Sequence, residues 1–223
     1  MNNLIGLGVS YAFVAAVLVL ASLLQRVFSI SPGVTRKIIH ISVCHWWLLL
    51  MYFFDTLAFA VIGPISFIII NYLSYRFRLM PAMELEDNRK NLGTVYFPIS
   101  LLVLVLLAYL DVIPIYAGAV GILIMGYGDG FASLLGECCG GRKIVFWGGT
   151  KSLLGSSAMF FLSALVTIII TWYFHPYGRD IPMLLLVAAV TAASATAVEL
   201  LTPLGLDNIT VPIISALIYS GMV

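Results

Sequence analysis

Residues 112–130 read VIPIYAGAVGILIMGYGDG, and this stretch decides the fold. Its first part, residues 112–128, contains no Asp, Glu, Lys or Arg. A helix that crosses the hydrocarbon core of a bilayer needs roughly 17–25 apolar residues, and this run is just long enough. Asp129 follows directly, between Gly128 and Gly130. The stretch therefore predicts a membrane-spanning helix with a carboxylate late in the span, near one membrane boundary.

The rest of the chain repeats this pattern. Of the 223 residues 62% are hydrophobic and only 9% are charged, whereas about a quarter of the residues in a soluble domain are charged. This composition excludes an ordinary cytosolic enzyme and a nucleic-acid binder with a basic face. The charged residues separate eight apolar runs, at 1–25, 38–54, 56–75, 91–110, 112–128, 152–178, 181–198 and 208–223.

These runs predict one all-α domain over residues 1–223, a polytopic integral-membrane bundle of about eight transmembrane helices. Seven helices are the alternative, because the run at 208–223 is short. The first run has no basic segment before it, so we expect it to be a span rather than a cleaved signal peptide.

The basic residues predict how the bundle is oriented. Of the 11 Lys and Arg residues, all but Arg179 lie in connections at one end of the predicted helices. The positive-inside rule places that end in the cytoplasm and the amino terminus outside. Four predicted helices also begin at the cytosolic end, and helix N-termini favour anions. We therefore expect the polar chemistry, and the loops that hold it, at the cytosolic face.

Carboxylates are expected at the same level of the bundle. Asp129 ends the fifth run, Glu199 lies after the seventh, and Asp207 precedes the eighth. An ionisable residue in a membrane segment is by default a functional candidate. Acids, bases and helix N-termini around an apolar pocket suit a nucleoside triphosphate with Mg²⁺, because oxygen ligands hold the metal and basic groups neutralise phosphate. Structural ion pairs within the membrane are the alternative interpretation.

Five motifs, taken in order, are similar to those of a known family. They are Arg36-Lys37-x-x-His40, GTVYFP at 93–98, GDGFA at 128–132 with GGRK at 140–143, KSLLGSSA at 151–158, and DNITVP at 207–212 after Glu199. Together they resemble the dolichol kinase, phytol kinase and CTP-dependent diacylglycerol kinase family, which is related to phosphatidate cytidylyltransferases. The resemblance extends from about residue 36 to residue 212.

The resemblance implies a kinase that transfers the γ-phosphate of CTP, with Mg²⁺ or another divalent cation, to a membrane lipid alcohol. That alcohol would be a polyprenol or dolichol, a phytol-type isoprenoid alcohol, or diacylglycerol. Asp129, Lys151 and His40 are expected to be catalytic, and Asp129, Glu199 and Asp207 to hold the metal. The residues expected to bind nucleotide or phosphate are Arg36, Lys37, Arg89, Gly93, Thr94, Gly128, Gly130, Lys143, Ser152, Gly155 and Asn208.

The sequence leaves two other functions open. A phosphatidate-type cytidylyltransferase is one, although the downstream His-Gly-Gly and Asp-Arg-x-Asp signatures of that branch are absent from this sequence. A lipid transporter is the other, although transporters commonly use inverted repeats and a site near the bilayer midplane. The expected partners are the lipid alcohol, CTP and membrane lipids, with no nucleic acid. The sequence predicts neither the particular alcohol nor the oligomeric state.

Overall fold

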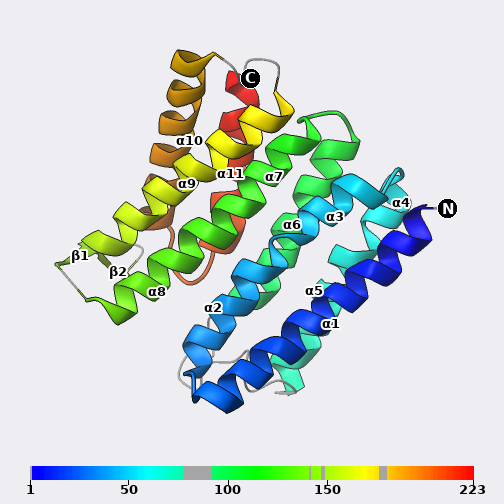
Figure 1. Cartoon of the computed structure of the whole chain (residues 1–223), viewed down its shortest axis with the longest axis horizontal. Helices are drawn as coiled ribbons and strands as arrows, with labels where there is room; N and C mark the ends of the chain where they lie inside the picture. Colours follow the sequence, from blue (N-terminus) through cyan, green and yellow to red (C-terminus); the bar gives the residue numbers. More distant parts are fainter. Residues whose placement is uncertain (1, 78–91, 141, 147–148, 176–179) are drawn as a thin grey trace.

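The computed structural model describes residues 2–77, 92–140, 142–146, 149–175 and 180–223, and shows a bundle of helices (Figure 1). The helices are α1 (Asn2–Phe28), α2 (Pro32–Val43), α3 (Trp46–Phe53), α4 (Leu57–Ala60), α5 (Ile62–Phe77), α6 (Gly93–Tyr109), α7 (Ile115–Leu123), η2 (Ile124–Asp129), α8 (Gly130–Cys138), α9 (Leu153–Phe174), α10 (Ile181–Leu201) and α11 (Asp207–Met222). The expected all-α class is confirmed. One small hairpin was not expected from the sequence. In it, β1 (Lys143–Phe146) pairs antiparallel with β2 (Gly149–Ser152).

The helices confirm a membrane protein. Among the described residues, five helical segments are long and apolar enough to cross a bilayer: Asn2–Phe28, Leu57–Phe77, Ile115–Cys138, Leu153–Phe174 and Ile181–Leu201. A further apolar helix, α6, is shorter. Helical structure is present in every one of the eight apolar runs. The total of eight crossings and their orientation stay predictions.

The second helix starts earlier than its apolar run and is broken in the middle. The side chain of Ser31 accepts a hydrogen bond from the backbone N–H of Val34, and Pro32 occupies the first helical position. Both features favour a helix start. The helix then turns at Cys44 and His45 before α3 begins. Arg36 and Lys37 therefore lie inside α2, one turn after its start.

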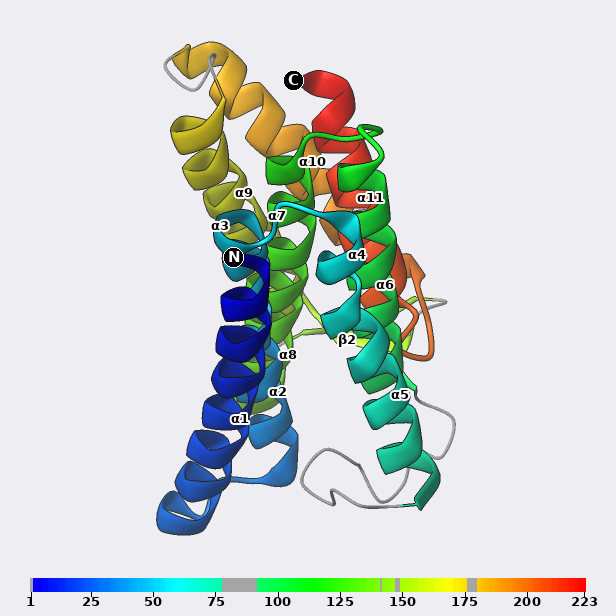
Figure 2. The same ribbon diagram turned by 90° about the vertical axis from the view of Figure 1, so that its right-hand side faces the viewer.

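The stretch quoted first forms the centre of the bundle. In the continuous helix α7–η2–α8, 72% of an apolar 18-residue stretch is buried inside the protein. The corresponding share for α1 is 22%. The helices α9 and α11 pack against it, as do α2 and α3 (Figure 1). Outside this centre, α1 packs along α2 and α5 along α6 (Figure 2). The central helix continues to Cys138, beyond the end of the predicted apolar run at residue 128, so Asp129 lies within the helix.

Close packing around η2 sets the position of Asp129. A Cβ atom added to Gly126 would lie 2.3 Å from Sγ of Cys44, and one added to Gly130 would lie 2.4 Å from Cγ1 of Ile41. Small residues at helix interfaces let membrane helices approach closely. The segment is also a π-helical turn, a rare form that is frequent at functional sites. These contacts hold the Asp129 turn directly against α2.

We predict that Gly126→Ala destabilises the bundle by about 1–3 kcal/mol, because its new methyl group has no room beside Cys44. The matched control is Gly8→Ala in α1, where an added Cβ has no neighbouring atom within 4 Å. Alanine favours helix over glycine, so the control should be neutral or slightly stabilising. The measurement is thermal unfolding of the purified proteins in detergent. Equal midpoints for the two variants would contradict the close packing at η2.

Candidate active site

Segments far apart in the sequence meet around one pocket of about 290 Å³. Helix α2 and the start of α6 form one side, and β2 with the α10–α11 connection forms another. The central helix contributes Asp129. The lining residues are Arg36, Lys37, His40, Gly93, Thr94, Asp129, Lys151, Thr202, Leu204, Gly205, Asp207 and Asn208. The tertiary structure therefore gathers both basic and acidic side chains from across the chain into one cavity.

The first charged contact of the pocket is an ion pair between α2 and η2. Asp129 is only 5% exposed, and its Oδ2 accepts a hydrogen bond from Nζ of Lys37 at 2.7 Å. A buried carboxylate needs such a partner, because removing an unpaired charge from water is costly. A buried ion pair is nevertheless weak grounds for inferring stability, since desolvation offsets much of the attraction. The pair is therefore better explained by the chemistry of the pocket than by folding.

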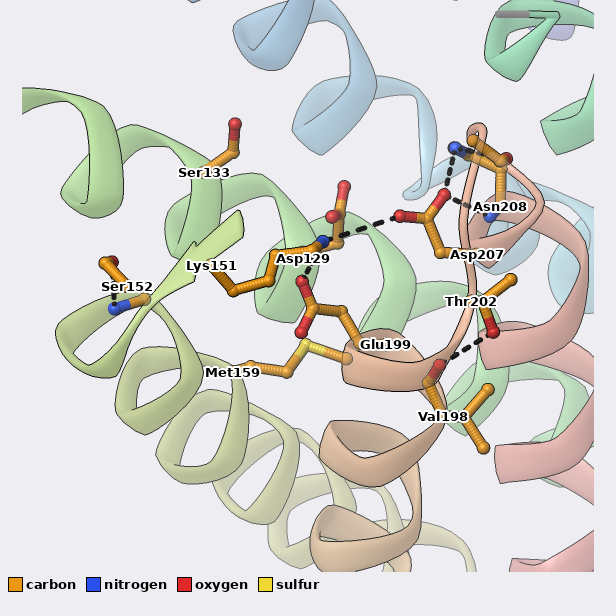
Figure 3. A network of polar contacts seen from close by, with 12 residues as sticks. Asp129, Ser133, Lys151, Ser152, Met159, Val198, Glu199, Thr202, Asp207 and Asn208 are labelled. Atoms are coloured by element: carbon orange, nitrogen blue, oxygen red, sulfur yellow. Dashed lines mark hydrogen bonds and ion pairs between the residues drawn. The ribbon is translucent and has the colours of Figure 1, made fainter. Parts of the chain in front are cut away.

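The second contact centres on Lys151 (Figure 3). Its Nζ donates a hydrogen bond to Oε1 of Glu199 and lies 3.9 Å from Oδ2 of Asp207. Glu199 comes from the end of α10 and is 3% exposed. Oδ1 of Asp207 also accepts hydrogen bonds from the backbone and side-chain nitrogens of Asn208. One lysine thus joins the hairpin to the last two helices.

Burial and nearby charges shift the pKa values of two pocket residues outside the spanning helices, Lys151 and Asp207. Burial disfavours the ammonium form of Lys151, but the carboxylates of Glu199, Asp129 and Asp207 outweigh burial and raise the pKa of Lys151 above its usual value. Burial and the charge of Asp129 raise the pKa of Asp207 to about 6, although Lys151 opposes this shift. Lys151 is therefore a fixed cation within reach of an anionic ligand.

Of the buried polar side-chain atoms that have no hydrogen-bond partner among the described residues, two lie at the pocket. They are Nε2 of His40, in the pocket lining, and Oε2 of Glu199, beside it. A buried polar atom without a partner costs about 1–3 kcal/mol, so native proteins rarely retain one without a reason. In the described part of the chain no three His, Cys, Asp or Glu residues form a ready metal cluster. The acids are instead held by Lys37 and Lys151.

Most of the predicted site residues meet in this pocket. Those that line it are Arg36, Lys37, His40, Gly93, Thr94, Asp129, Lys151, Asp207 and Asn208, and Glu199 joins them through Lys151. Arg89 lies outside the described residues. Lys143 is exposed on β1 and is absent from the lining.

Four other predicted residues serve local structure. Ser152 caps α9 by accepting a hydrogen bond from the backbone N–H of Gly155 at 3.0 Å. Gly128 and Gly130 pack against Met159 and Ile41. None of the four lines the pocket, and direct contact of these residues with nucleotide stays a prediction.

Three pocket residues in the connection between α10 and α11 were not expected from the sequence. Thr202, Leu204 and Gly205 line the pocket, and Leu204 and Gly205 have φ angles of +61° and +77°. Positive φ is uncommon for leucine and marks a backbone held by its surroundings. The Oγ1 atom of Thr202 donates to the Val198 carbonyl at 2.7 Å (Figure 3). The only sequence signal is a Thr-Pro pair followed by glycine, which indicates a turn but no ligand.

Together, the fold and the pocket define a class: membrane-embedded helical proteins with a buried cavity of lysine–carboxylate pairs. The chain is 36% identical to a phytol kinase of Synechocystis sp. over 221 residues, covering 96% of this chain and 90% of that protein. A probable chloroplastic phytol kinase of Triticum aestivum is 36% identical over 63% of this chain and 48% of its own length. A probable chloroplastic phytol kinase 1 of Oryza sativa subsp. japonica is 31% identical over 84% and 64%.

The chain belongs to the phytol kinase family, and it is therefore a transferase of the kinase class. The resemblance inferred from the five motifs is confirmed. No family model matches the chain, and no solved structure matches it.

Proposed function

We propose that this protein transfers the γ-phosphate of CTP to the hydroxyl of a membrane isoprenoid alcohol at the cytosolic face. The main observation is the pocket of opposing charges inside an apolar helical bundle. A phosphoryl donor needs the charges, and an alcohol with a long hydrocarbon chain needs the apolar surroundings. The isoprenoid class is supported by the phytol kinases among the relatives. The choice of CTP rests on the motif resemblance, and the cytosolic face on the distribution of Lys and Arg.

The existing ion pairs prepare the pocket for a metal-bound phosphate donor. Lys37 and Lys151 are each held by a carboxylate. A donor of this kind presents anionic oxygens together with a cation, so the lysines can turn to phosphate while the carboxylates turn to the metal. Binding then exchanges ion pairs and leaves no buried charge unpaired, which would otherwise cost several kcal/mol. Arg36 adds a third cation at the pocket wall.

The oxygen donors present suit a divalent metal of the Mg²⁺ kind, although the described acids form no ready cluster while Lys37 and Lys151 hold them. Asp129, Glu199 and Asp207 offer only oxygen ligands, which Mg²⁺ prefers. The unpartnered Oε2 of Glu199 is an orphaned acceptor that such a cation would satisfy. When bound, the metal would neutralise charge on the phosphate oxygens.

The rest of the proposed chemistry depends on residues of this chain. Lys151 lies at the edge of the hairpin, where its ammonium group can stabilise negative charge on the transferring phosphoryl group. Phosphoryl transfer requires mainly positioning of the two reactants and charge stabilisation. The pocket supplies both, because its walls come from packed helices and its acids Asp129 and Glu199 are buried beside partly buried lysines.

We predict that the purified protein in lipid nanodiscs converts an isoprenoid alcohol to its monophosphate and releases CDP. The assay offers phytol, a long polyprenol and diacylglycerol separately, each with CTP, ATP or UTP, and identifies products by mass spectrometry. A chelator should abolish the product and added Mg²⁺ should restore it. A CDP-linked lipid with released pyrophosphate would instead identify a cytidylyltransferase. No lipid product with any combination would reject the proposed function.

A further inference from the structure

We infer that His40 accepts the proton of the alcohol hydroxyl through Nε2, so that the α2–α6 side of the pocket is the subsite for the lipid alcohol. This inference rests on the proposed function and assigns a group that the motif pattern leaves open, the base. It follows from the position and bonding of one imidazole ring, and from the hydrogen-bonding chemistry of the two substrates.

The ring of His40 lies in the pocket lining with one nitrogen unpartnered. His40 lies on α2, lines the pocket, and packs against the edge of Phe97 from α6 with ring centroids 4.7 Å apart. Its Nε2 is buried without a hydrogen-bond partner among the described residues. We assign the ring proton to Nδ1. The lone pair of Nε2 is then free.

A free lone pair suits the alcohol hydroxyl and not the phosphate groups of the nucleotide. Neutral imidazole at Nε2 can only accept a hydrogen bond. The ionised phosphate groups of a nucleotide offer only acceptor oxygens, so they do not complement this atom. An alcohol hydroxyl carries the donor proton that Nε2 lacks. The cations Arg36 and Lys37 on the same helix have no acceptor at all, which leaves His40 as the acceptor that α2 contributes to the pocket lining.

The other candidate bases are already engaged. Asp129 is held by Lys37, and Asp207 accepts from Asn208. Glu199 is held by Lys151 through one oxygen, and its second oxygen belongs to the acidic set proposed for the metal. These carboxylate oxygens thus have partners or are assigned to the metal, whereas Nε2 of His40 has no hydrogen-bond partner among the described residues.

The transfer step balances with His40 as the base. The O–H bond of the alcohol breaks and its proton moves to Nε2, while the alcohol oxygen forms a bond to the γ-phosphorus. The bond between the γ-phosphorus and the bridging oxygen breaks, and its electron pair leaves with the nucleoside diphosphate. The imidazolium then releases its proton to water. A positioned base of this kind contributes typically 10²–10⁴-fold to the rate.

The test uses two variants of His40 in the whole protein, in nanodiscs. His40→Ala removes the ring and should lower kcat by about 10²–10⁴-fold. The Kd for Mg²⁺–CTP should stay within about threefold of wild type, because the lost interaction is made only in the transition state. Added imidazole should enter the vacated space and raise the kcat of this variant at least about tenfold. His40→Gln retains an acceptor but no base, so the KM for the alcohol should change little while kcat stays low.

The matched control is His45→Gln on the neighbouring turn. Both ring nitrogens of His45 are engaged, Nδ1 with the Ser42 carbonyl at 3.0 Å and Nε2 with the Tyr127 hydroxyl at 2.9 Å. It is absent from the pocket lining. This variant should show at most a stability loss, with no response to imidazole.

The outcomes separate this inference from the proposed function. Wild-type protein that makes lipid phosphate, with His40→Ala within threefold of its kcat, would overturn the base assignment alone. Loss of Mg²⁺–CTP binding in parallel with kcat would place His40 on the donor side and overturn it too. If His40→Ala fails to fold, His40→Gln decides, since wild-type kcat in that variant is incompatible with a base. A wild-type protein without any lipid product would reject the proposed function itself.

Discussion

Asp129→Asn is expected to lower turnover by about 10³-fold or more, an effect of about 4 kcal/mol on the transition state. The amide has the shape of the carboxylate but no charge, so it can neither hold a divalent metal strongly nor keep Lys37 in place. Because Asp129 lies on the central helix between both lysines of the pocket, its charge influences every other group there. The measurement is kcat with the alcohol and nucleotide identified above, together with the thermal midpoint of unfolding.

A double variant separates the loss of chemistry from a loss of folding. Lys37→Met with Asp129→Leu removes both partners of the buried ion pair and should be about as stable as wild type, since apolar replacements of buried pairs are often neutral or stabilising. It should remain inactive. Asp129→Asn with turnover within threefold of wild type would show that Asp129 has only a structural role and would reject the proposed site.

Lys151→Ala is expected to lower turnover by about 10²–10³-fold, the range seen when a single group that stabilises transition-state charge is removed. The same change leaves Glu199 buried without its partner and removes the charge that faces Asp207. We therefore also expect a stability loss of about 1–3 kcal/mol, less than for a fully buried pair because Lys151 is partly exposed. Both quantities are measured on one preparation, by steady-state kinetics and by thermal unfolding.

The companion variant is Lys151→Met with Glu199→Gln. It removes both charges, keeps similar side-chain volumes and should recover most of the lost stability while staying inactive. Recovery of activity along with stability would mean that Lys151 acts only by satisfying Glu199. In that case the proposed role of its ammonium group at the phosphoryl group would be wrong.

Much of the bundle could be predicted from one-dimensional patterns. Apolar runs interrupted by charges predict helices because backbone groups in a bilayer must satisfy each other within a helix or barrel. The candidates Asp129 and Lys151 stood out for the same reason, since charges next to apolar runs are costly and rarely without function. The structure brings both into one pocket with His40 and Asp207.

Other features depend on contacts that no local pattern encodes. The glycines at 128 and 130 were assigned to nucleotide, but in the structure they pack against Met159 and Ile41. A glycine that faces phosphate and a glycine that faces a neighbouring helix look identical in the sequence. Glycines also weaken a helix in isolation, whereas here the neighbouring helices hold the central helix continuous through Asp129.

The sequence by itself determined a chain of apolar helices with its charges between them, and its motifs determined the family, because both follow from residue order alone. Only the tertiary structure decided that Lys37 pairs with Asp129 and Lys151 with Glu199, and that Thr202, Leu204 and Gly205 border the same cavity. These contacts join positions up to 92 residues apart. Their geometry depends on how whole helices pack, which the order of residues within any one helix does not specify.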